Sequence, residues 1–262
     1  YDAFKALKVE RRGAVKRITL DNPPLNAMTD EGHEELAHIF RTIARDKETR
    51  VVVITGAGEK GFSAGGNIQN MKDGLHNHAR WVKGLTEARE VVLNMLECDK
   101  PVISRINGHA IGVGATIALC SDITIMVDTA KIGDTHVKVG LVAGDGGALL
   151  WPALVGIVQA RRYLLTGDLL TGKEAVAIGL VTECVTAGEL DAAVQRWVDR
   201  FENGASVALY GTKRSLNMAI RQQALVFTDT HPGLETNSQL ARDHAEAVDA
   251  FLEKREPKVE GR

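Results

Sequence analysis

Short β-type runs and helix-type spacing of apolar residues alternate along the first part of the chain. Apolar positions on both sides of a tight turn predict a β-hairpin over residues 7–20. A helical period begins after Thr29, and a second one covers residues 82–95. The continuous apolar runs at 51–55 and 102–106 are typical of strands that are covered on both faces, as in α/β proteins.

Glycine-rich loops follow these predicted strands repeatedly. They span Gly56 to Gly66, Asn107 to Gly114 and Gly133 to Gly146, with a short helix at 115–120 and a strand at 123–127 between the last two loops. Because α/β enzymes carry their chemistry on loops that follow strands, we expect the functional residues in these segments.

Helical patterns dominate from Gly147 onward. The predicted helices cover 149–155, 160–165, 174–178, 190–201 and a long stretch from Thr236 to Lys254. The pattern predicts an α/β fold in which residues 1–200 form the core and residues 201–262 form a helical region. That region would pack on the core or on a neighbouring subunit.

Composition narrows the function classes. The 262 residues are 44% hydrophobic and 25% charged, with a net charge of −2 and no basic cluster, so nucleic acid and anionic membranes are poor partners. No apolar run approaches the ~20 residues of a membrane span, and the start lacks the layout of a secretory signal, so we expect a cytoplasmic protein. The three cysteines lie far apart in apolar contexts and predict neither disulfides nor a metal site.

Two of the glycine-rich loops have features of anion-binding segments. Phe62 to Ile68 contains two adjacent glycines, which allow the backbone to approach a ligand, and Asn107 to Gly114 leads into a helix whose first N–H groups are free. A dinucleotide site is the obvious rival for the second loop. However, Ile117 stands where the third glycine of that fingerprint belongs, so we disfavour a nicotinamide cofactor.

These two loops, the segment Leu25-Asn26-Ala27-Met28 and the strand that begins at Pro101 closely resemble the crotonase (enoyl-CoA hydratase/isomerase) family. The resemblance extends from about Val15 to Arg255. It implies a crotonase-like core, a spiral of repeated strand–strand–helix units. It also implies a C-terminal helical trimerisation region, and therefore a homo-trimer or a hexamer built from two trimers.

The resemblance also implies an oxyanion hole that holds a thioester oxygen as it becomes an enolate. By position its two N–H groups belong to Gly66 and Val113, although the family usually has glycine at the second position. Ala27 and Ala64 match segments that bind the substrate in the coenzyme-A-dependent relatives. Coenzyme A would therefore enter as part of the substrate, with no separate cofactor and no metal.

Hydratases of the family use two glutamates, and in this chain those positions hold Thr116 and His136. Thr116 can line the substrate pocket but cannot serve as an acid or a base. Asp145 follows His136 by nine residues in the same loop, so the two could form a base with its orienting carboxylate. The alternatives are a hydrogen-bonded loop histidine and an aspartate that caps the next helix.

The spacing of His136 and Asp145, together with the following Trp151, is similar to that of 6-oxocamphor hydrolase, a family member that cleaves a carbon–carbon bond in a β-diketone without coenzyme A. The additional active-site histidine of that enzyme has no counterpart here. Three hypotheses therefore remain: an acyl-CoA enzyme with a His136–Asp145 dyad, a diketone hydrolase, and a non-catalytic acyl-CoA-binding protein.

Overall fold

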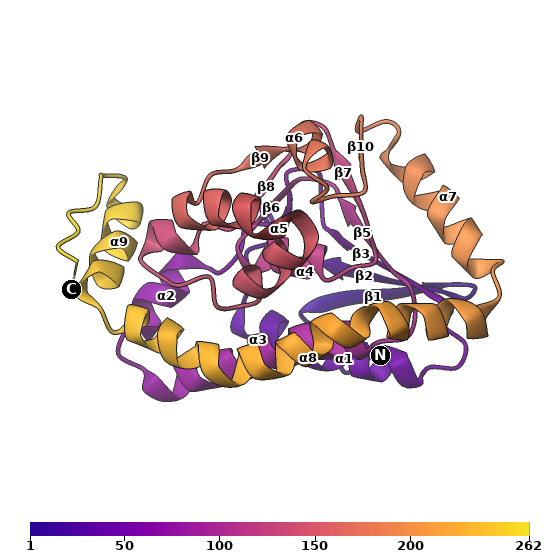
Figure 1. Cartoon of the computed structure of the whole chain (residues 1–262), viewed down its shortest axis with the longest axis horizontal. Coiled ribbons are helices and arrows are strands. Elements are labelled where there is room, and N and C mark those ends of the chain that lie inside the picture. The colour runs from indigo at the N-terminus through magenta and orange to yellow at the C-terminus, as the bar shows by residue number, and fades with distance from the viewer. Residues whose placement is uncertain (262) are drawn as a thin grey trace.

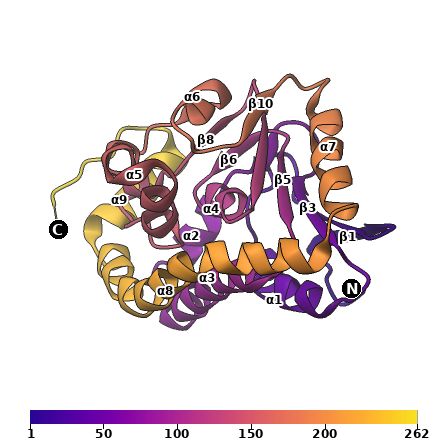
Figure 2. The same ribbon diagram turned by 45° about the vertical axis from the view of Figure 1, so that its right-hand side comes forward.

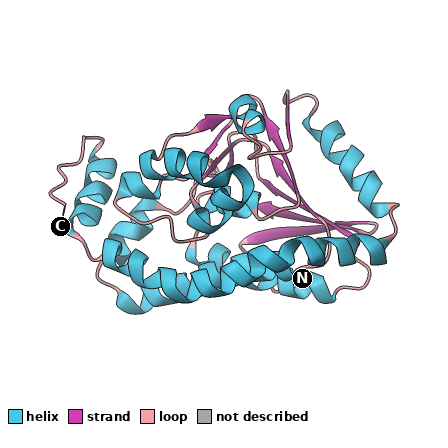
Figure 3. Cartoon of the chain, in the orientation of Figure 1, coloured by secondary structure: helices cyan, strands magenta, loops and turns pink. Residues whose placement is uncertain are grey.

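Two β-sheets form the centre of the computed structural model, which describes residues 1–261 (Figures 1 and 3). The larger sheet contains β1 (Leu7–Arg12), β2 (Val15–Leu20), β3 (Val51–Gly56), β5 (Val102–Ile106), β7 (Ile123–Val127) and β10 (Glu183–Val185), in that order. The smaller sheet contains β4 (Gly61–Ser63), β6 (His109–Ile111), β8 (Lys131–Gly133) and β9 (Leu170–Thr171). The hairpin β1–β2 is antiparallel, and the rest of the larger sheet is parallel.

After the hairpin β1–β2 and its helix, three successive turns of the chain each give one strand to each sheet and then form helical structure. β3 and β4 precede α2 (Ile68–Gly74) and α3 (His78–Glu97), and β5 and β6 precede α4 (Val113–Leu119). β7 and β8 precede the short 3₁₀ helix η1 (His136–Val139) and α5 (Gly147–Thr166). This arrangement confirms the predicted strand–strand–helix spiral.

The elements form where apolar side chains can be buried on the required faces. All six residues of β3 are buried, as expected of a central parallel strand. In α1 (Asp30–Arg45) the buried Leu36, Ile39, Phe40 and Ile43 follow the helical period and pack toward α3. The hydroxyl of Thr29 accepts a 3.0 Å hydrogen bond from the N–H of Gly32 and caps the start of this helix.

The C-terminal part contains α6 (Gly172–Ala177), α7 (Leu190–Glu202), α8 (Ser206–Gln239) and α9 (Arg242–Glu253). Figure 2 shows α7 beside the larger sheet and α8 passing across α3 below the sheets. The predicted single helix from Thr236 to Lys254 is wrong, because α8 already begins at Ser206 and the helix is interrupted between Gln239 and Arg242. Packing against α3 and α5 lets α8 continue through Pro232, which in the sequence suggests a break.

None of the helices in residues 1–261 combines the length and the apolar character that a membrane span requires.

Candidate active site

The loop after β4 presents one unpaired N–H group. Gly66 forms an isolated parallel bridge with Met28, and the N–H of Met28 donates to Gly65 O at 2.8 Å. In such a bridge the N–H of Gly66 itself points away from Met28. Gly65 has φ +85°, which an L side chain rarely adopts, and an added Cβ would lie 2.8 Å from Ile111 O.

The start of α4 presents a second unpaired N–H group. Val113 is the first residue of this helix, so its N–H has no intrahelical partner, and Gly112 before it has φ +54°. The two loops touch, since a Cβ built on Gly112 would lie 3.9 Å from Cα of Gly65. No hydrogen bond within residues 1–261 uses the N–H of Gly66 or of Val113.

A cavity of about 220 Å³ lies in front of these two loops. Part of its wall is apolar and comes from α2, α3 and the loop after η1: Met71, Trp81, Leu85, Ala88 and Leu141. The remaining lining residues include titratable groups from several elements: His33, Glu87, His136, Asp145, Glu235 and His244. An apolar cavity with a few convergent polar groups is typical of a small-molecule site.

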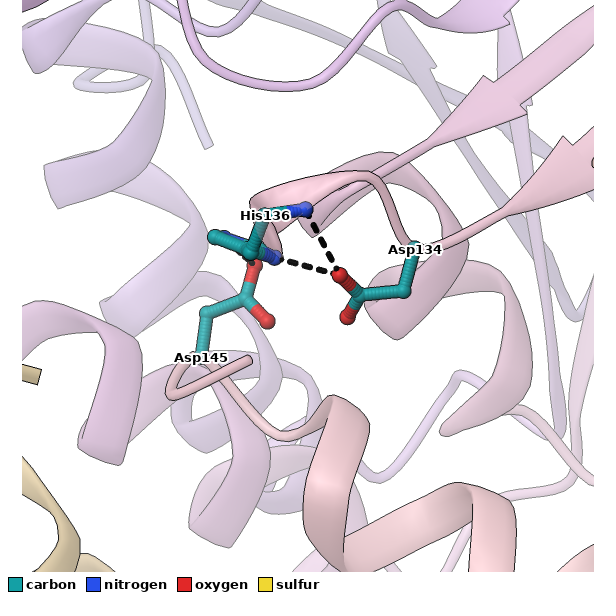
Figure 4. A group of neighbouring side chains, drawn as sticks. All are labelled: Asp134, His136 and Asp145. Atoms are coloured by element: carbon teal, nitrogen blue, oxygen red, sulfur yellow. Dashed lines mark hydrogen bonds and ion pairs between the residues drawn. The ribbon is translucent and has the colours of Figure 1, made fainter. Parts of the chain in front are cut away.

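His136 is held by an aspartate two residues before it (Figure 4). Oδ1 of Asp134 lies 2.6 Å from Nδ1 of the His136 ring, and the backbone N–H of His136 donates to the same oxygen at 3.1 Å. The other ring nitrogen, Nε2, lies 3.6 Å from Oδ2 of Asp145, which is an ion-pair distance rather than a hydrogen bond. His136 is thus placed between two buried carboxylates.

The charges of this cluster shift the pKa of each member. Burial lowers the pKa of His136, but the charges of Asp134 and Asp145 outweigh burial and hold it well above its ordinary value. Burial raises the pKa of Asp134, yet the cation and the hydrogen bonds of His136 bring it below its ordinary value. Burial and the charge of Asp134 together leave the pKa of Asp145 raised. The pKa values of His136 and Asp145 are therefore both raised, which favours the protonated form of each group.

Asp145 is supported from the side opposite His136. Its Oδ1 accepts a 3.0 Å hydrogen bond from the hydroxyl of Thr116, whereas the buried Oδ2 has no hydrogen-bond partner within residues 1–261. The residue that precedes α5 is Gly146, and no side chain caps this helix, so Asp145 does not serve as its cap. Oδ2 of Asp145 is buried, and its neighbour is Nε2 of His136 at 3.6 Å.

Comparisons with known proteins agree with this geometry. The family model for enoyl-CoA hydratase/isomerase matches residues 10–262. The chain belongs to the enoyl-CoA hydratase/isomerase family. It is 32% identical to the short-chain-enoyl-CoA hydratase of Clostridium acetobutylicum, over 97% of this chain and 96% of that protein. It is 30% identical to the carnitinyl-CoA dehydratase of Escherichia coli K12, over 98% of this chain and 99% of that protein.

Solved structures show the same fold. An enoyl-CoA hydratase/isomerase from Mycobacterium paratuberculosis superposes with a TM-score of 0.86 at 33% identity, over 93% of this chain and 97% of that one. The chain is therefore an enzyme of this family, and its spiral core is the family fold.

The structure places the other predicted site residues of this family member behind or beside the cavity. Ala27 and Ala64 belong to the strand-like segments that carry Met28 and Gly66, and neither lines the cavity. Thr116 is buried and reaches Asp145 rather than the cavity. Trp151 lies in the core with 1% exposure, against Tyr163.

Asn67 lines the cavity and also caps α2, since its Oδ1 accepts from the N–H of Asn70 at 3.1 Å. Asn67 therefore has a structural role in α2 and a place in the cavity wall.

Two residues of the site were not singled out from the sequence. Asp134 precedes His136 closely enough that the pattern aspartate-x-histidine could have indicated the contact. Glu235 lies on α8, far along the chain from the loops, and no local pattern connects it to them.

Asp134, His136 and Asp145 offer ligand atoms within 4.8 Å of one another, a spacing that a metal ion could use. Nδ1 of His136 already contacts Asp134, so only Nε2 and Asp145 would face a common ion. Zinc sites usually have at least three protein ligands, so the cluster is better suited to proton transfer.

Proposed function

We propose that this enzyme acts on an acyl-CoA thioester through an enolate whose oxygen is bound by the N–H groups of Gly66 and Val113. The supporting observation is that these two unpaired donors lie on touching loops and belong to residues that line the same cavity as His136. Fixed dipoles aimed at developing charge are usually the largest catalytic contribution, because they require no reorganisation during the reaction.

In this proposal His136 and Asp145 move the proton at the carbon next to the thioester. The gap of 3.6 Å between Nε2 and Oδ2 is too long for a hydrogen bond between them, and both residues line the cavity. Asp134 fixes the ring by binding Nδ1, which directs Nε2 toward Asp145 and the cavity. The dyad would replace the pair of glutamates of the family's hydratases, with His136 in one of their positions and Asp145 beside the other.

The names of the relatives, a hydratase and a dehydratase of CoA thioesters, favour addition or removal of water. Coenzyme A would enter as part of the substrate, with no separate cofactor. We also propose a homo-trimer or a hexamer. Helices α5 and α8 carry exposed apolar side chains that a subunit contact would cover: Ile157, Val158, Leu165, Val207, Leu216 and Val226.

Calorimetric titration with a series of acyl-CoA thioesters, the matching free acids and a bicyclic β-diketone tests the substrate class. We expect heat of binding with the thioesters and none with the free acids. Tight binding of the diketone without binding of any thioester would instead favour the carbon–carbon bond hydrolase. Thioester binding without turnover in a spectrophotometric assay would favour the non-catalytic alternative.

A further inference from the structure

Glu235 is a buried carboxyl group that the proposed proton transfer does not use. It lies on α8, is 7% exposed, and lines the same cavity as His136 and Asp145. Its side chain makes no hydrogen bond or ion pair with any of residues 1–261. Burying a carboxyl group without a partner costs several kcal/mol when it is charged, so such a group is rarely retained without a function.

The surrounding structure fixes Glu235 in this position. Its carboxyl group occupies the space in which a side chain at position 144 would lie, because a Cβ built on Gly144 would be 1.7 Å from Oε2 of Glu235. The next residue, Thr236, accepts a 2.9 Å hydrogen bond from Nε1 of Trp81. Ser238 accepts a 3.1 Å bond from the N–H of Val142, which ties α8 to the loop that carries Asp145.

Burial keeps a substantial fraction of this carboxyl group protonated at neutral pH. Its pKa is raised to about 7: burial raises it most, the cation of His136 lowers it, and the charges of Asp145 and Asp134 raise it. A neutral carboxyl group can donate a hydrogen bond or a proton, which a carboxylate cannot.

Other charged groups face the same cavities from the elements around Glu235. α3 contributes Arg80, Lys83, Glu87 and Arg89, α1 contributes Asp30 and His33, and α9 contributes His244. On α8 itself, His231 stacks on Phe227 one turn before Glu235, and burial lowers its pKa. Among the described residues, the charges that shift the pKa of Glu235 are those of His136, Asp145 and Asp134.

We propose that Glu235 is a third acid–base residue of the active site, which donates a proton to an oxygen on the β-carbon of the acyl group. This inference rests on the proposed function and adds one further residue to it, for the elimination of water from a β-hydroxyacyl thioester. His136 and Asp145 act at the α-carbon, and Glu235, which reaches the cavity from α8 beside Gly144, acts on the leaving group.

The proposed step balances as follows. The His136–Asp145 pair takes the α-proton, and the electron pair of that C–H bond forms the enolate held at Gly66 and Val113. The enolate returns its electrons to form the C=C bond, the C–O bond at the β-carbon breaks, and the oxygen leaves as water with the proton of Glu235. The proton held by the pair then restores Glu235 to its acid form.

Two reactions of β-hydroxyacyl-CoA thioesters separate the roles. Exchange of the α-proton in deuterium oxide, followed by mass spectrometry, reports on His136 and Asp145, whereas formation of the enoyl thioester reports on all three residues. For Glu235→Gln we expect α-exchange close to wild type and elimination slower by about 10²-fold or more, since general acid catalysis contributes 10²–10⁴-fold. His136→Ala should lose both reactions.

The matched control is Asp229→Asn, which alters an exposed carboxylate on the same helix, paired with Arg89 at 3.4 Å. It should leave both reactions unchanged. The elimination rate of the wild type should also fall as the pH rises through about 7, because Glu235 then loses its proton, and Glu235→Gln should lack this decline.

If Glu235→Gln eliminates water at the wild-type rate, the inference is wrong. It is also wrong if this variant loses exchange and elimination equally, because Glu235 would then act at the α-carbon or stabilise the fold. Absence of α-exchange in the wild type with every thioester would overturn the proposed function itself. That result comes from the wild-type protein and not from Glu235→Gln, so failure of the proposed function can be distinguished from failure of the inference about Glu235.

Discussion

Oδ1 of Asp134 lies 2.6 Å from Nδ1 of His136, whereas Asp145, the partner inferred from the sequence, lies 3.6 Å from Nε2. The two carboxylates therefore contact opposite edges of one imidazole ring. The hydrogen bond that orients the His136 ring comes from Asp134. Asp145 lies near the other ring nitrogen and lines the cavity. This division leads to different expected effects for the two aspartates.

Asp134→Asn should reduce turnover by about 10²–10⁴-fold, because an amide neither holds the ring in one tautomer nor stabilises its cation. The pKa of His136 is raised partly by the charge of Asp134, so the substitution should lower it and the ring should lose its proton at a lower pH. NMR titration of the His136 ring measures this shift directly. A variant that keeps the wild-type titration curve would show that Asp134 does not control the ring. Asp168→Asn, on an exposed loop, serves as control.

Thr116→Val should reduce turnover less than Asp134→Asn does. Thr116 contacts the cluster at Asp145 and not at Asp134. The hydroxyl of Thr116 donates to Asp145 and lowers its pKa, so its loss should raise that pKa further. Asp145 then stays protonated to a higher pH, and the acidic limb of the activity profile should move upward. Turnover at neutral pH should fall about tenfold or less, as expected from a hydrogen bond worth about 0.5–1.5 kcal/mol. Thr116→Ser keeps the hydroxyl and should restore the wild-type profile.

The sequence was sufficient for the elements that bury long apolar faces. The run of β3 and the period of α1 have few structural alternatives, and both lie where predicted. The smaller sheet was missed because its strands have three residues or fewer and lie inside glycine-rich segments that predict loops. In the smaller sheet each strand pairs with a strand from the neighbouring turn of the spiral, and local sequence patterns do not predict such pairing.

The same distinction holds for the site. Gly66 and Val113 could be proposed because each stands in a glycine-rich loop that matches a motif of the family. Glu235 could not, because it reaches the cavity only when α8 packs across α3 and the loop of Gly144. Its contact with the site is a property of tertiary packing alone.

Val113→Pro tests the oxyanion hole without altering any titratable group. Proline is tolerated at the first position of a helix, and Val113 begins α4, so the fold should remain intact. The substitution removes the N–H group, and turnover should fall by about 10²–10³-fold. Val113→Gly keeps the N–H and should retain most of the activity. Equal rates for the proline and glycine variants would exclude this donor from the mechanism.

Light scattering at micromolar concentration should give a mass of three or six times the 28.3 kDa of one chain. The exposed Val158 of α5 and Leu216 of α8 are each 75% exposed in the single chain, which is unusual for large apolar residues on helices. Val158→Glu and Leu216→Glu should each shift the distribution to smaller species if these faces meet in the assembly. A wild-type monomer would contradict the trimer proposal.

Lys213 should be the most sensitive position for stability on α8. Its amino group is buried and donates to Oδ2 of Asp122 at 2.6 Å and to the carbonyl oxygen of Lys100 at 2.9 Å. Asp122 also accepts a 2.7 Å bond from the N–H of Val102, so this one cation joins α8 to the starts of β5 and β7. Lys213→Met keeps the length of the side chain but leaves Asp122 without its counter-charge.

Removing one partner of a buried ion pair costs about 3–5 kcal/mol, and we expect the lower end because a quarter of the Asp122 side chain is exposed. Urea denaturation at one fixed protein concentration measures the loss, since assembly would couple stability to concentration. Arg214→Met, at the next position, removes an exposed ion pair with Asp99 and should cost less than about 1 kcal/mol. The double variant Lys213→Met with Asp122→Asn should be less destabilised than the sum of the single variants, because no uncompensated charge remains. A Lys213→Met protein as stable as Arg214→Met would show that the ion pair with Asp122 does not stabilise the packing of α8 on the sheet.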